Sequence, residues 1–288
     1  MAANIGLGCV TFGREIDKDT SFALMDHALD MGVTHFDTAA AYSNGLSETI
    51  VGEWLAARDT RNNINIATKI LPPYNAAGIR QSIEQSLKRL QLETIDLLYL
   101  HRWDEVLTQP EAWLTLNELI TEGKIKNIGA SNFNTPQLAD TIKLLQSIAT
   151  TSLSYIQNNH NLAVSDISKE MMDLCHQKNI RIVTYSPLGA GFLTGKHLNG
   201  VQKKSRFDIM PAHQAIYSGA QARRRLDKLI QVATVTGHSP ALLAMAWTLH
   251  QPQTDSVLIG GRSTSQLDLA TEAIKFYVPE IFTELESD

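Results

Sequence analysis

The stretch "IDLLYLHRWDEVLTQPEAWLTLNELITEGKIKNIGASNF", residues 95–133, contains one strand–helix–strand unit. Its apolar runs at 95–100 and 125–130 have the length and composition of buried strands. Between them, Pro110 suits the first position of a helix and Gly123 its C-terminal end. Consecutive strands joined by a helix lie parallel in one sheet, so this unit predicts an α/β fold.

The same alternation of strand and helix continues over almost the whole chain. Helical periodicity is clear at 78–90, where the apolar residues share one face. Helix starts are predicted at Asn134 or Thr135, at Ser165 and at Ser239, because such side chains cap helices. The predicted strands are residues 5–10, 33–36, 64–68, 95–100, 125–130, 153–157, 180–185 and 256–259.

Eight such units in 288 residues predict a closed (β/α)8 TIM barrel. The alternative is an open doubly wound sheet, because the sequence does not show closure. No linker, repeat or low-complexity tract divides the chain, so a single domain over 1–288 is expected. The one interruption is 186–221, which is long, rich in glycine and without period, and we interpret it as a lid loop after strand seven.

Composition excludes several classes of protein. The net charge of −5 gives no general attraction for nucleic acid, and 43% hydrophobic residues allow a sizeable core. Cys9 and Cys175 are far apart and form no metal-binding motif, so neither a disulfide nor a metal is expected. The chain shows no basic leader and no apolar run of about 18 residues. A cytoplasmic protein that does not bind membranes is therefore expected.

Polar residues follow the predicted strands at the ends where a barrel enzyme carries its active site. Asp37, Lys69 and His101 end strands two, three and four. Any one alone is more often a turn residue, but their coincidence on three consecutive strands favours a site. The later strands end at Ser131 and Asn132, at Gln157 and at Tyr185.

The chemistry of such a group follows from charge. Asp37 and Lys69 on neighbouring strands neutralise one another, which allows both to be buried. An ammonium group beside Tyr42 is expected to lower the pKa of its hydroxyl and make it a better acid. A second hydrogen bond from His101 to the same oxygen suits carbonyl reduction, or alcohol oxidation in reverse. None of these residues carries a hydride, so a cofactor is required.

The sequence lacks the Gly-rich fingerprint of a Rossmann dinucleotide site. "GLGCVTFG" (6–13) has the wrong spacing for its last glycine, and "GAGFLTG" (189–195) reads GxGxxxG. The string "GAGFLTGKH" (189–197) also fails the phosphate-loop pattern.

Residues 5–273 nevertheless resemble the aldo-keto reductases, in the bacterial branch related to the potassium-channel β subunits. The motifs that carry the resemblance are "GLGCVTFG", "FDTAAAYSNGLSETIVGEWL", "ATK", "DLLYLHRWD", "EGKIKNIGASNF", "YIQNNHNL", "YSPLGAGFLTGK" and "IGGRSTSQLDLA". The resemblance implies a barrel that binds NADPH in extended form. It also implies Tyr42 as general acid, Lys69 and Asp37 as its tuning pair and His101 as orienting residue.

The same resemblance implies which residues bind NADPH or NADP. They are Thr11, Phe12, Asp37, Ser131, Asn132, Gln157, Tyr185, Pro187, Leu188, Gly191, Leu193, Lys196, Gly260, Arg262 and Gln266. Ser131, Asn132 and Gln157 would bind the nicotinamide carboxamide, and Tyr185 would stack on the ring. The backbone of 187–196 would surround the pyrophosphate.

Arg262 and Gln266 would lie near the 2′-phosphate, which favours NADP over NAD. The last motif departs from the family at Leu269 and Ala270, where a Glu-Asn pair is common. The resemblance therefore does not secure NADP selectivity there.

The expected substrate is a small molecule, an aldehyde, ketone or open-chain sugar. Two alternatives stay open: a sugar or polyol dehydrogenase working in the oxidative direction, and a cofactor-binding regulatory subunit without turnover. The physiological substrate, the direction of the reaction and the oligomeric state are not predicted.

Overall fold

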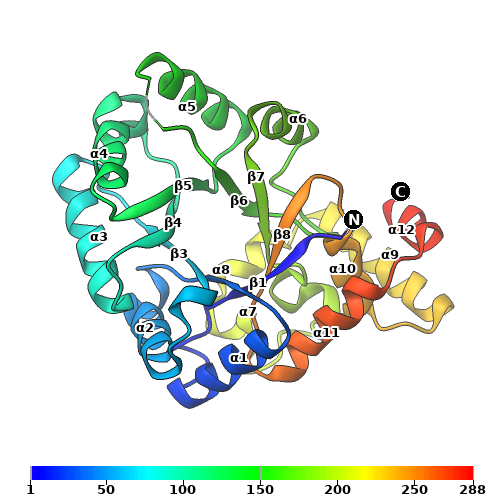
Figure 1. The fold of residues 1–288 in the computed structure, drawn as a ribbon. Helices are drawn as coiled ribbons and strands as arrows, with labels where there is room; N and C mark the ends of the chain where they lie inside the picture. Colours follow the sequence, from blue (N-terminus) through cyan, green and yellow to red (C-terminus); the bar gives the residue numbers. More distant parts are fainter. Residues whose placement is uncertain (1, 150, 288) are drawn as a thin grey trace.

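The computed structural model describes residues 2–149 and 151–287, and the strands of this part of the chain close into a barrel (Figure 1). Strands follow one another round the barrel in chain order, and every neighbouring pair is parallel. The strands are β1 (Asn4–Gly8), β2 (His35–Asp37), β3 (Asn65–Ile70), β4 (Ile95–Leu100), β5 (Ile125–Ser131), β6 (Tyr155–Asn159), β7 (Arg181–Tyr185) and β8 (Thr254–Ile259).

β1 closes the barrel by pairing on both of its edges. Leu7 lies opposite Phe36 of β2 on one side and opposite Ile259 of β8 on the other. An open sheet would leave its first and last strands without this contact. The prediction of a (β/α)8 barrel is confirmed, and the doubly wound alternative is excluded.

Helices surround the strands (Figure 1), and their apolar faces cover the outer side of the barrel. The longer helices are α1 (Lys18–Asp30), α2 (Leu46–Arg58), α3 (Ala76–Leu90), α4 (Pro110–Thr121), α5 (Thr135–Ser147), α6 (Lys169–Lys178), α9 (Ala220–Thr236), α10 (Pro240–Leu249), α11 (Thr264–Lys275) and α12 (Pro279–Glu286). Among the described residues, no single helix is long and apolar enough to cross a membrane. α9 and α10 reach that length and hydropathy only together, bent by 110°.

Helix starts show where local prediction works and where it fails. Asn134 caps α5 and forms a capping box with Gln137, and Ser239 caps α10. The predicted cap at Ser165 is wrong, because α6 begins after Ser168. The Ser165 hydroxyl is engaged instead in the loop, where it lies 2.6 Å from Nδ1 of His160.

The segment 186–221 contains short helices rather than an unstructured loop. They are η4 (Gly189–Thr194), α7 (Arg206–Ile209) and α8 (Ala212–Ile216). Tyr217 stacks on Phe192 and on Phe207, with ring centroids 5.4 Å and 6.0 Å away. The segment therefore has short helices that its sequence, which shows no period, did not predict, and its role as a lid loop stays a prediction.

The barrel interior is filled by large side chains set against small ones. Ala67, Leu97 and Tyr99 form an inward cluster, separate from the core that lies between strands and helices. A Cβ atom at Gly129 would lie 2.5 Å from the ring of Tyr99, so only glycine leaves room for that ring. The interior is thus packed below the carboxyl ends of the strands, which are free to carry a site.

Candidate active site

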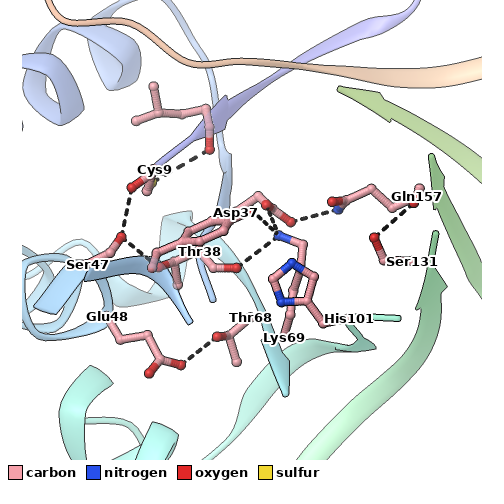
Figure 2. A network of polar contacts seen from close by, with 12 residues as sticks. Cys9, Asp37, Thr38, Ser47, Glu48, Thr68, Lys69, His101, Ser131 and Gln157 are labelled. Carbon is pink, nitrogen blue, oxygen red and sulfur yellow. Dashed lines mark hydrogen bonds and ion pairs between the residues drawn. The ribbon is translucent and has the colours of Figure 1, made fainter. Parts of the chain in front are cut away.

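Asp37 and Lys69 form a buried ion pair at the carboxyl ends of β2 and β3 (Figure 2). Their side chains are 2% and 1% exposed. Lys69 Nζ contacts Asp37 Oδ1 and donates a hydrogen bond to the Thr38 carbonyl at 3.0 Å. Burial lowers the pKa of Lys69, but the Asp37 carboxylate and Tyr42 together raise it by more, so the pKa lies above its ordinary value and the amine stays charged.

Tyr42 is brought to this pair by a tight turn, η1 (Tyr42–Gly45), between β2 and α2. Ser43 and Asn44 adopt left-handed conformations there, with φ of 50° and 54°. The Ser43 hydroxyl donates to the Phe12 carbonyl at 2.9 Å, which ties the turn to the loop after β1. As a result the Tyr42 hydroxyl lies 3.3 Å from Lys69 Nζ.

The Lys69 ammonium group lowers the pKa of Tyr42, as expected, but the net pKa lies above its ordinary value. Burial raises the pKa of Tyr42, and this outweighs the lowering caused by Lys69. The Asp37 carboxylate adds to the rise because it offsets part of the lysine charge. The hydroxyl therefore holds its proton at neutral pH, as a proton donor must.

His101 follows β4 directly and lies edge-on to Tyr42, with ring centroids 5.8 Å apart and planes at 81°. Burial and the charges of Lys69 and Arg102 lower its pKa to about 3. The imidazole is therefore neutral at neutral pH and has one N–H to donate. Its Nδ1 is buried and has no hydrogen-bond partner within the described ranges.

The polar residues at the ends of β5 and β6 connect to the same group. Gln157 Nε2 donates to Asp37 Oδ2 at 2.8 Å, and the Ser131 hydroxyl donates to the Gln157 carbonyl at 3.0 Å (Figure 2). Asn132 Nδ2 donates to the His101 carbonyl at 2.9 Å, and the Tyr185 hydroxyl donates to Asn132 Oδ1 at 2.6 Å. These contacts link the carboxyl ends of five strands into one network.

A nicotinamide dinucleotide carries phosphates, and one part of this structure fits them. Lys196 and Arg262 have no carboxylate within 4.0 Å among the residues that the structure describes. Burial and the charge of Arg262 lower the pKa of Lys196. Lys196 lies over Gly191, where a Cβ atom would be 2.5 Å from its Nζ. Two neighbouring cations without a counterion suit a phosphate dianion.

Other predicted cofactor residues have mainly internal contacts. Phe12 and Leu193 are fully buried in the core, Pro187 is buried, and Leu188 packs against the core. The amides of Gly191 and Leu193 donate to the Leu188 carbonyl at 3.0 Å and 3.2 Å. These two amides are therefore not free donors for a pyrophosphate.

The residues after β8 are held to the loop after β1. Thr11 donates to the Gly261 carbonyl at 2.9 Å. Gln266 accepts from the Arg262 amide at 2.7 Å, and Gly260 is exposed. The predicted adenosine end thus lies beside the predicted Thr11 and Phe12 loop, although Thr11 and Gln266 already make contacts within the protein.

Sequence reasoning missed Asn158, which follows Gln157 and is 1% exposed. Its Oδ1 accepts from the Asn132 amide at 2.9 Å, and its Nδ2 donates to the Phe133 carbonyl at 2.8 Å. Asn132 has a left-handed φ of 61°, which these bonds help to hold. The polar run "QNNHN" (157–161) was the available signal, but only its first residue was taken as part of a site.

Nothing in the described residues resembles a metal site, since no group of three or more metal-ligating side chains is brought together. Cys9 and Cys175 are both buried free thiols. Burial raises the pKa of Cys9 well above its ordinary value.

Comparison with known proteins agrees with this geometry. The model of the aldo/keto reductase family matches residues 4–284. The chain is 33% identical to the aldo-keto reductase YhdN of Bacillus subtilis, over 94% of this chain and 85% of the relative. It is 29% identical to the uncharacterized oxidoreductase YrpG of the same organism, over 98% of this chain and 90% of the relative. It is 27% identical to the norsolorinic acid reductase of Aspergillus flavus, over 95% of this chain and 74% of the relative. The chain belongs to the aldo/keto reductase family, whose members are oxidoreductases that act on carbonyl compounds.

Proposed function

We propose that the protein reduces the carbonyl group of an aldehyde, ketone or open-chain sugar to an alcohol, with NADPH as cofactor and Tyr42 as general acid. The observation that carries the proposal is the position of Lys69 Nζ, which contacts Asp37 and lies 3.3 Å from the Tyr42 hydroxyl. A buried ammonium group stabilises the phenolate that forms as Tyr42 gives its proton to the substrate oxygen. Asp37 keeps that ammonium group charged.

His101 serves the same substrate oxygen from a second direction. Its low pKa keeps the ring neutral, so it donates a hydrogen bond without competing for the proton of Tyr42. Two donors aimed at one oxygen stabilise the negative charge that develops there during reduction. In the oxidative alternative the same residues would act in reverse, with the Tyr42 phenolate accepting the proton of the alcohol.

The bound nicotinamide would supply the hydride. Ser131, Asn132 and Gln157 would hold its carboxamide group, and Tyr185 would stack on its ring. Lys196 and Arg262 would bind phosphate groups, since they are neighbouring cations without a counterion in the described part of the chain. Arg262 Nη1 donates to the Lys204 carbonyl at 2.7 Å, and its other N–H groups would bind a 2′-phosphate, which favours NADPH over NADH.

The test is an activity screen with NADPH and NADH over aldehydes, keto acids and sugars, and with NADP and alcohols in reverse. Tyr42→Phe should lower kcat for reduction by roughly 100- to 10,000-fold, because it removes the proton donor. NADPH binding, followed by fluorescence quenching, should change little. The matched control is Tyr99→Phe, since Lys69 Nζ also lies over that ring, 5.8 Å from its centroid.

We expect Tyr99→Phe to keep turnover within a few-fold of the wild type. Unchanged turnover in Tyr42→Phe would remove this residue from the acid role. Tight NADPH binding without turnover of any carbonyl would instead favour a regulatory, cofactor-binding protein.

A further inference from the structure

Ser47 and Glu48, at the start of α2, contact the ends of three strands (Figure 2). The Ser47 hydroxyl donates to the Cys9 carbonyl at 2.8 Å, just after β1. Because its one proton is used there, the Thr38 hydroxyl donates to Ser47, at 2.8 Å. Glu48 Oε1 accepts from the Thr68 hydroxyl of β3 at 2.5 Å.

Thr68 and Lys69 are consecutive in β3, so their side chains point to opposite faces of the strand. Lys69 points into the barrel toward Asp37, and Thr68 points outward toward α2 (Figure 2). Glu48 therefore holds the outer face of the strand at the residue next to Lys69.

The second oxygen of Glu48 is linked through Arg89 to the turn that carries Tyr42. Arg89 Nε, from the last turn of α3, donates to Glu48 Oε2 at 2.7 Å. The Arg89 side chain lies against Gly45, the last residue of η1, where a Cβ atom would be 2.7 Å from both Cδ and Nε. The guanidinium thus packs directly under the turn that begins with Tyr42.

Glu48 is fully buried, whereas Arg89 is 26% exposed. Both carboxylate oxygens of Glu48 have a partner, one on the Lys69 strand and one beneath the Tyr42 turn. Buried ion pairs of this kind contribute little net stability, but they restrain geometry because breaking either contact leaves a buried charge.

We propose that Glu48 is a positioning residue, which fixes the Tyr42 turn against β3. It thereby sets the 3.3 Å separation between the Tyr42 hydroxyl and Lys69 Nζ. This inference rests on the proposed role of Tyr42 as proton donor.

Glu48→Ala should lower kcat by about 10- to 100-fold, because misplacement by about 1 Å costs that much in a proton-transfer site. The KM of the substrate and the Kd of NADPH should change less than about 3-fold, since the cofactor residues lie on other strands. With Lys69 further away, the pKa of Tyr42 rises. The fall of kcat at alkaline pH, which reports loss of the Tyr42 proton, should therefore move to higher pH.

A second readout does not depend on turnover. In cofactor-free protein with ring-labelled tyrosine, NMR signals assigned through Tyr42→Phe should show a smaller ionised fraction of Tyr42 at a fixed alkaline pH. Thr68→Val removes only the hydroxyl that binds Glu48 and keeps a β-branched strand residue. Thr68→Val should lower kcat and the ionised fraction of Tyr42, as Glu48→Ala does. If Glu48→Ala does not fold, Thr68→Val alone tests whether Glu48 positions Tyr42.

The matched control is Asp96→Asn, because Asp96 lies near the N-terminal end of β4, at the other end of the strand from His101. Asp96 is a second buried carboxylate, 6% exposed and paired with Arg61 and Lys126 at 2.7 Å each. This variant should lose stability, but the pH at which kcat falls on the alkaline side and the ionised fraction of Tyr42 should stay as in the wild type. The proposal is overturned if folded Glu48→Ala or Thr68→Val keeps wild-type kcat and Tyr42 ionisation. An equal shift in Asp96→Asn would also overturn it, because the effect would then be general loosening.

Failure of the proposed function gives a different result. Tyr42→Phe would then keep wild-type turnover, while the NMR readout on Tyr42 in Glu48→Ala would still decide whether Glu48 positions that hydroxyl.

Discussion

Asp37 and Lys69 show how a charged pair is accommodated in the interior of a barrel. Neither side chain reaches solvent, so each would be costly to bury alone. Asp37 accepts from Lys69 on one oxygen and from Gln157 on the other. Lys69 also donates to the Thr38 carbonyl, which uses a second of its three protons. The charges are therefore paired and hydrogen-bonded, and the third proton of the Lys69 ammonium group is directed to the Tyr42 hydroxyl.

Lys69→Met should destabilise the fold by about 3–5 kcal/mol, because it leaves the Asp37 carboxylate buried without a counterion. Adding Asp37→Asn should restore part of this loss, since the uncompensated charge is then removed. The free energies of unfolding in urea measure both effects. If the double variant is as unstable as Lys69→Met, the loss comes from packing and not from the charge.

Residues differ in how visible their roles are in the sequence. Asp37, Lys69 and His101 could be predicted because a charged or imidazole side chain ends an apolar run. Thr68 looks like an ordinary β-branched strand residue, and Glu48 looks like a first-turn helix acid. Their roles depend on contacts between α2, α3 and β3, which no local pattern contains.

At the scale of elements, the turn η1 and helix α2 act as one unit. Gly45 ends the turn with a φ of 88° and begins α2, so the direction of the helix and the place of Tyr42 are set together. Only glycine takes this φ without strain, and only glycine leaves room for Arg89 beneath it.

Gly45→Ala should therefore cost more than left-handed strain alone. The strain accounts for about 1–2 kcal/mol, and displacement of Arg89 adds about 1–3 kcal/mol of overpacking. The control is Gly237→Ala, because Gly237 has a φ of 75° but open space around the missing Cβ. Thermal unfolding compares their stabilities, and only Gly45→Ala should also lower kcat. Equal losses of stability in the two variants would show that the Arg89 side chain moves aside at no energetic cost.

Element boundaries were predictable where the signal is local. β4 begins and ends at the predicted residues, because its apolar run is bounded on both sides. β1 ends at Gly8 rather than at 10, and β6 begins at Tyr155 rather than at 153. These limits depend on where a neighbouring strand supplies hydrogen bonds. The helices in 186–221 are too short to show a period, so they could not be predicted.

At the scale of the whole molecule, closure was the step that the sequence could not decide. The pairing of Leu7 with Ile259 joins residues from the two ends of the chain. Apolar strands followed by helices are equally compatible with an open parallel sheet. Closure brings the loop after β1 next to the loop after β8, as the bond from Thr11 to the Gly261 carbonyl shows.

Burial of histidine makes the whole fold sensitive to acid. Burial lowers the pKa of His160 to about 4 and, with the charges of Lys69 and Arg102, that of His101 to about 3. Their ordinary value is 6.5, so between these values the unfolded chain binds more protons than the folded one. Stability from this source is therefore complete above pH 6.5 and falls as the pH drops toward 4.

His160→Gln should remove the His160 part of this loss. Glutamine can keep a polar contact with Ser165, whose hydroxyl lies 2.6 Å from His160 Nδ1, but it does not titrate. Between pH 7 and pH 5 the wild type should lose about 2 kcal/mol more of its free energy of unfolding than the variant. Urea unfolding at the two pH values measures this difference. His101→Gln should also reduce the loss of free energy of unfolding on acidification, and its effect should extend down to about pH 3. A variant that loses as much stability as the wild type would mean that His160 is already protonated in the folded protein, because only an uncharged native imidazole makes acid unfolding favourable at this position.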